Sequence, residues 1–240
     1  MTIGCEVTAG TGGLTVSLAG RLGLRDVPPL RERLLMCLAE QPEALLLDLS
    51  ALHVEQPPAL TVFTALASQA ARWPGTPVLL CTGSEEMWTL IAGLEQQIRL
   101  FTGLEHAREH LRGEGRAMPS HSEELLPVAG ATRHARDVAT EACLRWGLPD
   151  LTAPASLIVN ELVANAIDHA GTMMTLRLSL RDRFLDIGVR DGSPARPPAP
   201  KPVPPEAAGG RGLLLVDALA YAWGCLPSAD GKVMWAALHR

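Results

Sequence analysis

The chain has 240 residues, of which 47% are hydrophobic and 20% are charged, and its formal net charge is −5. This composition provides enough apolar residues for a core in each of two domains and excludes a chain that is disordered by composition. The acidic balance argues against direct nucleic-acid binding, which usually requires a basic patch.

Cysteine usage and the absence of long apolar runs bear on the cellular compartment. The sequence contains 5 cysteines, an odd number, and none of them forms a C-x-x-C pair. This pattern favours reduced thiols over a disulfide framework or a structural zinc site. The opening segment MTIGCEVTAGTGG lacks the basic and apolar regions of a signal peptide, and no apolar run approaches the roughly 20 residues of a membrane-spanning helix. We therefore expect a cytoplasmic protein that makes no contact with a membrane.

Strand and helix patterns alternate in the first half of the chain. Strands are predicted at Leu14–Gly20, Ala44–Ser50, Pro77–Gly83 and Ile98–Phe101, and helices at Val27–Glu40, Ala59–Trp73, Glu85–Gly93 and Leu104–Leu111. The alternation indicates an α/β domain over residues 1–112, with helices packed on a sheet. Residues 113–124 combine Gly, Pro, Ser and charge without periodicity, which predicts a linker.

The second half, residues 125–240, has a different order of elements. Helices are predicted at Ala131–Trp146, Thr152–Ala170 and Gly212–Gly224, and strands at Met174–Asp182, Arg183–Asp191 and Lys232–Arg240. Thr152 is expected to cap the second helix, with Pro154 in its first turn. The two neighbouring strands form a predicted hairpin, so we expect a helical layer on one face of an antiparallel or mixed sheet.

The second of these helices carries the segment NELVANAIDHA, residues 160–170. Glu161, Asn165 and Asp168 fall at i, i+4 and i+7, so they share one helical face, while the opposite face is apolar. An amide oxygen one turn from a carboxylate suits Mg²⁺, and Glu161 could orient or deprotonate a nucleophile beside the metal. The alternative is an amphipathic helix whose polar face meets water.

Two further motifs have the composition of nucleotide-binding segments. Asp191 and Gly192 follow a strand, and a carboxylate there can accept a hydrogen bond from an exocyclic amine such as that of adenine; the alternative is an ordinary Asp-Gly turn. The glycine-rich segment GGRG, residues 209–212, opens a helix and suits a phosphate group. Its alternative is a simple connection.

These motifs, NELVANAIDHA, VRDGSP and GGRGLLLV, resemble in order and spacing the GHKL (Bergerat) ATP-binding domain, and most closely its anti-sigma-factor serine-kinase branch. The resemblance covers about residues 125–240 and implies a Bergerat-type α/β sandwich that binds ATP and Mg²⁺. It implies that Glu161 is the catalytic base and that Asn165 is the metal ligand. The cofactor-binding residues that follow from it are Asn165, Asp168, Asp191, Gly192, Gly210, Arg211 and Gly212.

The first half resembles a STAS domain, the fold of anti-sigma-factor antagonists, through LTVSLAGRL, ALLLDLSAL and PVLLCTG. In antagonists of this family, a loop hydroxyl after the Asp-Leu-Ser strand accepts phosphate from the partner kinase. Aligned on Asp48–Ser50, the loop positions fall on Gln56–Ala59, where this chain has QPPA. Proline has no hydroxyl, so the resemblance implies a STAS domain that lacks its phosphoacceptor.

Together the two resemblances imply a regulatory, ATP-dependent serine/threonine kinase. It would phosphorylate a STAS-type antagonist and control a sigma factor by partner switching. The alternative is a non-catalytic, nucleotide-binding adaptor that sequesters a sigma factor or a STAS protein. The partners implied are a STAS-type antagonist, a sigma factor, the chain's own STAS-like half and, because kinases of this branch are often dimers, a second copy.

Overall fold

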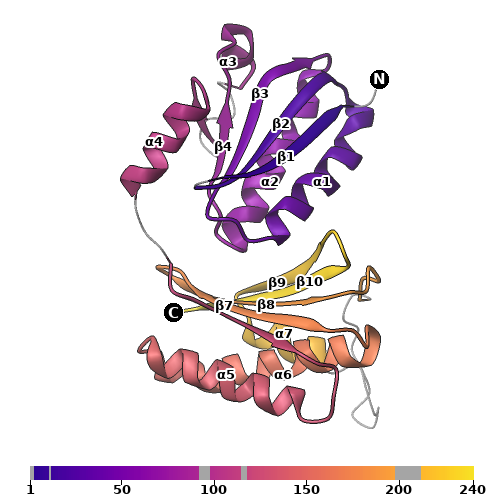
Figure 1. Cartoon of the computed structure of the whole chain (residues 1–240), viewed down its shortest axis with the longest axis vertical. Helices are drawn as coiled ribbons and strands as arrows, with labels where there is room; N and C mark the ends of the chain where they lie inside the picture. The colour runs from indigo at the N-terminus through magenta and orange to yellow at the C-terminus, as the bar shows by residue number, and fades with distance from the viewer. Residues whose placement is uncertain (1–2, 11, 92–97, 115–117, 198–211) are drawn as a thin grey trace. The chain divides into compact units, whose positions relative to one another are not determined.

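The computed structural model describes residues 3–10, 12–91, 98–114, 118–197 and 212–240. The chain divides into two compact units, Met1–Arg116 and Ala117–Arg240, and each unit has its own five-stranded sheet (Figure 1). Among the described helices, none is both long enough and apolar enough to cross a membrane.

The first unit builds a mixed sheet in the order β1-β2-β3-β4-β5, in which β1 is antiparallel to β2 and the other neighbours are parallel. Its strands are β1 (Gly4–Gly10), β2 (Gly13–Leu22), β3 (Leu45–Val54), β4 (Val78–Cys81) and β5 (Arg99–Phe101). Its helices are α1 (Val27–Ala39), α2 (Thr61–Arg72), α3 (Glu85–Ile91) and α4 (Leu104–Glu114). The alternating helix-on-sheet arrangement predicted for this half is confirmed.

Both faces of the first sheet are covered at β3 and β4, which explains why these strands are apolar. Helices α1 and α2 pack side by side on one face (Figure 1), and α4 packs on the other, where Ala107 and Phe101 join Leu46 and Leu79 in one core cluster. Central parallel strands buried on both faces are expected to be continuous apolar runs. The segment Leu45–Leu47 is such a run, with every residue almost fully buried.

Strand β1 was not among the predicted elements. It is the edge strand of the sheet, and of its residues only Cys5 is even half-buried. An exposed edge strand needs no alternation of apolar and polar residues, so Gly4–Gly10 lacks the signal by which strands are recognised. Its place is fixed by antiparallel pairing with β2.

The second unit is an antiparallel sheet in the order β6-β7-β8-β10-β9, with its helices on one face. Its strands are β6 (Ser120–Leu125), β7 (Met174–Leu180), β8 (Phe184–Asp191), β9 (Ala222–Pro227) and β10 (Lys232–His239). Its helices are α5 (Ala131–Arg145), α6 (Thr152–His169) and α7 (Gly212–Leu219). Figure 1 shows α5 and α6 side by side beneath the sheet. The predicted helical layer on one face of an antiparallel or mixed sheet is confirmed, and the sheet is antiparallel.

The core of the second unit lies between the sheet and these helices. Every second residue of β8 points into it, namely Leu185, Ile187 and Val189, and α6 contributes Ile158 and Leu162. All of these side chains are fully buried. This alternation sets the direction of the residue that follows Val189 by two positions, Asp191.

Three details of the second unit differ from the sequence-based expectations. Residues 120–124, expected to end an irregular linker, belong to β6, a polar edge strand in which only Leu125 is buried. Helix α7 ends at Leu219, and Ala222–Gly224 begin β9 instead of continuing the helix. Thr152 does not cap α6, because Leu151 occupies that position and the buried Thr152 hydroxyl has no partner among the described residues.

Candidate functional site

Helix α6 presents the predicted polar face. Glu161 and Asn165 are half-buried one helical turn apart, while Asp168 and His169 are exposed at the end of the helix. The opposite row, which includes Leu162 and Ala166, is buried in the core. The helix therefore anchors one side in the core and holds two polar side chains in a partly enclosed environment on the other.

Glu161 lies against the first residue of α7. A Cβ atom placed on Gly212 would lie 2.4 Å from Glu161 Oε2, closer than any non-bonded contact allows. The other carboxylate oxygen, Oε1, accepts a hydrogen bond of 3.0 Å from the side-chain amide of Asn160. Gly212 thus permits the start of α7 to approach the carboxylate, and the structure brings these two predicted site residues together.

Replacing Gly212 with alanine is expected to displace the Glu161 carboxylate while leaving the fold intact. The clash involves the end of a flexible side chain, which can rotate away at small cost, and the main chain does not have to move. If Glu161 is the catalytic base, the variant should lose on the order of 10-fold or more in phosphotransfer because the base is displaced. Its melting temperature should stay within a few degrees of wild type, and transfer at the wild-type rate would contradict the importance of this contact.

Asp191 points from the end of β8 toward the helix layer. It follows Leu185, Ile187 and Val189 at the period of two, and only 1% of it is exposed. Lys232, the first residue of β10, is its directly paired neighbour across the strands. Lys232 precedes the inward-facing Met234 by two residues, so it points to the same side and is also buried.

The Asp191 carboxylate is only partly satisfied. Its Oδ1 atom accepts hydrogen bonds of 2.8 Å from Lys232 Nζ and 2.8 Å from the backbone N–H of Ser193. Lys232 Nζ also donates to the carbonyl oxygen of Ser193 at 3.1 Å. The Oδ2 atom is buried and has no partner among the described residues. Buried carboxylate oxygens are nearly always bonded, so this atom marks a place for an external donor.

The turn after β8 is tied to the segment that follows α6. The backbone N–H of Gly192 donates to the Thr172 hydroxyl at 2.9 Å. The Asp191 end of the site therefore lies by the C-terminal end of α6, and Glu161, eight residues before His169, lies about 12 Å back along the helix axis. Asn165 falls between these two ends. The spacing separates Asp191, whose Oδ2 atom has no partner among the described residues, from Glu161, whose carboxylate lies beside the start of α7.

Gly231 is required on the other side of this turn. A Cβ atom at Gly231 would lie 2.1 Å from the carbonyl oxygen of Asp191. The chain before Lys232 thus comes into contact with the backbone of Asp191, which holds the two strand ends together.

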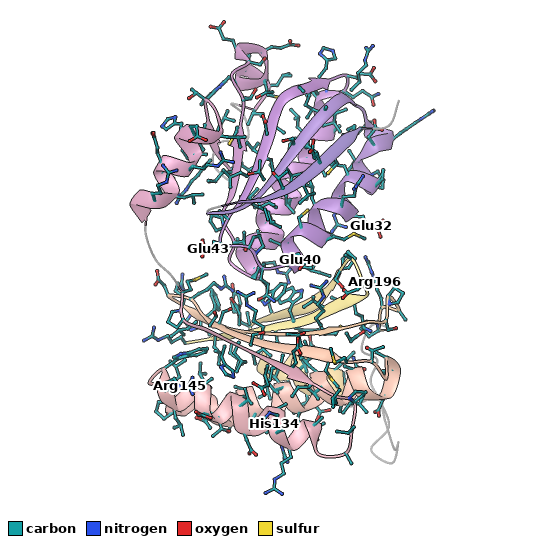
Figure 2. All side chains as sticks on the ribbon, viewed as in Figure 1. Glu32, Glu40, Glu43, His134, Arg145 and Arg196 are labelled. Carbon is teal, nitrogen blue, oxygen red and sulfur yellow. The ribbon has the colours of Figure 1, made fainter. Side chains whose placement is uncertain are left out.

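Burial raises the pKa of the Cys225 thiol on β9, while the positive charges of Arg196 and Lys232 act to lower this pKa. Arg196, labelled in Figure 2, belongs to the segment that follows β8.

Other predicted residues are not joined to these contacts. The Asp168 carboxylate is exposed and bonds to none of the described residues, so its role in cofactor binding stays a prediction. Gly210 and Arg211 lie outside the described residues. Outside the predicted set, His134, labelled on α5 in Figure 2, has its Nε2 atom 3.1 Å from Glu123 Oε1 of β6, which is a structural contact between the helix and the edge strand.

A separate hollow of about 540 Å³ lies in the first unit and contains none of the predicted site residues. It is bordered by Asp48 and Ser50 of β3, by Thr102 before α4, and by His106 and Arg108 of α4. Its walls carry acidic and basic groups with no buried, unpartnered polar atom. We therefore place the candidate site in the second unit, where such an atom exists.

Lys232 and Thr172 are the residues of this site that sequence reasoning missed. Thr172 has no motif of its own. Lys232 begins a predicted strand in which every second residue, such as Met234, faces the core. Lysine is rarely buried unless it is paired, so its place among these core-facing positions could have indicated a buried ion pair. What the sequence does not contain is the pairing register that sets Lys232 opposite Asp191.

Comparison with known proteins agrees with this location. Residues 127–233 match the family model described as the histidine kinase-like ATPase domain, and every predicted site residue from Glu161 to Gly212 lies within that range. The match confirms the likeness to an ATPase domain of this kind and implies ATP binding. The narrower assignment to the serine-kinase branch stays a prediction.

One solved structure is similar to the N-terminal part of the chain. It is the crystal structure of an anti-sigma factor antagonist from Mycobacterium paratuberculosis, with 23% sequence identity and a TM-score of 0.40, covering 46% of this chain and 95% of that chain. The comparison with curated proteins gave no match.

Proposed function

We propose that the second unit binds Mg·ATP and transfers its γ-phosphoryl group to a serine or threonine of a STAS-type antagonist protein. The chain would then act as an ATP-dependent regulatory kinase that controls a sigma factor by partner switching. Within the unit, Asp191 would hold the adenine end of the nucleotide, and Glu161 with Gly212 would lie at the phosphate end.

The observation that carries this proposal is the buried Oδ2 atom of Asp191, which has no partner among the described residues. An exocyclic amine such as that of adenine is a donor of the type that this oxygen lacks. The match of residues 127–233 to a histidine kinase-like ATPase domain supports the same ligand independently.

The donor set of α6 also fits the phosphate end of Mg·ATP. Among the described residues, the half-buried amide of Asn165 makes no hydrogen bond, so its oxygen is free to serve as a hard ligand. Mg²⁺, held by Asn165 together with the phosphates and water, would neutralise phosphate charge. Glu161 would orient the acceptor hydroxyl and take its proton. Gly212 would let the backbone at the start of α7 come close to the phosphates.

The acceptor in this proposal is a protein other than the chain's own loop. The positions aligned with the STAS acceptor loop fall on Gln56–Ala59, none of which has a hydroxyl group. The last three of these positions begin the short 3-10 helix Pro57–Leu60. The nearest hydroxyl, that of Thr61, donates to the carbonyl oxygen of Pro58 at 2.8 Å. A separate STAS protein with an intact acceptor serine or threonine is therefore the proposed substrate.

Incubating the full chain with γ-labelled ATP, Mg²⁺ and purified STAS proteins tests the proposal. We expect label on a serine or threonine of an intact STAS partner and none on the first unit of the chain itself. A partner whose acceptor is replaced by alanine is the control. Nucleotide binding without transfer to any STAS partner would overturn the kinase proposal.

The same feature of the first unit favours a second candidate function. A STAS-like unit that has QPPA at its acceptor loop cannot be switched by phosphorylation there, because none of these four residues has a hydroxyl group. The chain could then serve as a nucleotide-binding adaptor that sequesters a sigma factor or a STAS protein. Stable binding of such a partner with no phosphotransfer would support this candidate over the kinase.

A further inference from the structure

The ion pair between Asp191 and Lys232 is unusual because both side chains are almost completely buried, with 1% and 3% of their surfaces exposed. Ion pairs buried in this way are weak contributors to stability, because desolvation offsets the attraction between the charges. A pair that only closed the strand ends could be replaced by apolar residues without loss. Its position at the candidate nucleotide site suggests another role.

The ion pair leaves one hydrogen-bond donor of Lys232 and one acceptor of Asp191 without a partner among the described residues. A lysine ammonium group has three donors, and Lys232 uses one on Asp191 Oδ1 and one on the carbonyl oxygen of Ser193. Among the described residues there is no partner for a third donor. Asp191 Oδ2 is an acceptor with no partner among the same residues. One donor and one acceptor are thus left next to each other in a buried place.

The ring edge of adenine has the complementary pattern. Its N1 atom is an acceptor, and the neighbouring exocyclic amine is a donor. We propose, on the basis of the function proposed above, that Lys232 donates its remaining proton to N1 of adenine while Asp191 Oδ2 accepts from the amine. Lys232 is then a base-recognition residue that contacts the nucleotide directly.

The geometry explains why both residues are available for the same ring edge. Lys232 and Asp191 are directly paired across β10 and β8 and point to the helix side of the sheet. The Ser193 backbone holds both groups, donating to the carboxylate at 2.8 Å and accepting from the ammonium group at 3.1 Å. The Asp191 carboxylate and the Lys232 ammonium group are thus held in place by hydrogen bonds to each other and to the Ser193 backbone. This arrangement is preorganised for a planar contact at two points.

The test compares ATP with 1-deaza-ATP, in which N1 is replaced by C–H and the exocyclic amine is kept. In the wild-type full chain with Mg²⁺, we expect calorimetry to show about 10- to 100-fold weaker binding of 1-deaza-ATP, because a buried charged donor loses its partner. In Lys232→Met, the difference between the two nucleotides should fall below about threefold, since the donor is already absent.

Arg181→Met is the matched control variant. Arg181 forms another largely buried ion pair of the same sheet, with Asp186, in which Arg181 Nη2 donates to Oδ1 at 2.6 Å. Its loss should destabilise the unit but leave the preference for ATP over 1-deaza-ATP at the wild-type value.

A second measurement needs no variant at the site and therefore does not depend on whether Lys232→Met folds. The chain has lysine only at positions 201 and 232, so selective ¹⁵N labelling of lysine side chains gives one amine signal from each, assigned with Lys201→Met. Saturation with ATP should shift the Lys232 signal, and saturation with 1-deaza-ATP should produce only a small part of that shift.

The outcomes separate this inference from the function on which it rests. If the wild-type chain binds no ATP at all, the proposed function fails and the inference fails with it. If ATP binds, but 1-deaza-ATP binds equally well and shifts the Lys232 signal equally, the function stands and the role of Lys232 is overturned. If wild type and Lys232→Met prefer ATP over 1-deaza-ATP to the same extent, another residue contacts N1. That result would also overturn the role of Lys232.

Discussion

Asp191→Asn is expected to abolish ATP binding and to destabilise the second unit at the same time. The asparagine has nearly the same shape, but it would leave the buried Lys232 ammonium group without a counter-charge, which costs about 3–5 kcal/mol. Its amide nitrogen, if turned to the Oδ2 position, would face the adenine amine donor to donor. Affinity measured by calorimetry should fall at least about 100-fold, and the melting temperature should fall by on the order of 10 °C.

Two companion variants separate these effects. Asp230→Asn removes an exposed carboxylate of the neighbouring hairpin, where Arg190 is the main cause of a lowered Asp230 pKa, and it should change neither property by much because exposed ion pairs contribute little. In Asp191→Asn with Lys232→Met, the unpaired charge is gone, so stability should recover while ATP binding stays lost. Near wild-type affinity in Asp191→Asn would reduce Asp191 to a structural partner of Lys232.

Glu161→Gln is expected to separate nucleotide binding from phosphotransfer. Glutamine can still accept the 3.0 Å hydrogen bond from Asn160 through its side-chain oxygen and fills the same space beside Gly212, but it cannot take a proton. Affinity for Mg·ATP should stay within about threefold of wild type, while the transfer rate should fall by about 10²- to 10⁴-fold, the usual contribution of a general base. Rapid-quench assays with a STAS partner measure the rate.

Glu141→Gln on α5 provides the control for removing one negative charge from a helix of the same unit. Glu141 is largely exposed and pairs with Arg145 one turn later on the same helix, so this variant should transfer phosphate at the wild-type rate. Retained transfer in Glu161→Gln would show that another group takes the proton, or that positioning alone is sufficient.

Sequence patterns predicted the architecture well where one face of an element is buried. The apolar row of α6 and the alternation of β8 gave correct element types because burial imposes periods of 3.6 and 2 on the residues. The strands that were missed, β1, β9 and most of β6, all lie at the edges of their sheets. The residues of β1 and β6 are largely polar or exposed. Each is held by backbone pairing with a single neighbouring strand, and such pairing imposes no periodic pattern on the side chains.

The candidate site was predictable for the same reason, but only in part. Glu161 and Asn165 share a helix face, so helical spacing alone places them one turn apart. The approach of Gly212 to Glu161 depends on tertiary packing of α7 on α6, which the family resemblance implied and the local pattern did not. The partner of Asp191 required the register of β8 against β10, a nonlocal quantity that fixes Lys232 as its neighbour.

Calorimetric titration of the full chain with ATP, in Mg²⁺ and again in EDTA, tests the central claim that the second unit is a Mg·ATP site. We expect saturable binding in Mg²⁺, at least about 10-fold weaker binding in EDTA, and loss of this Mg²⁺ dependence in Asn165→Ala, since the variant lacks the proposed ligand. No binding under either condition, or the same affinity with and without Mg²⁺, would contradict the account.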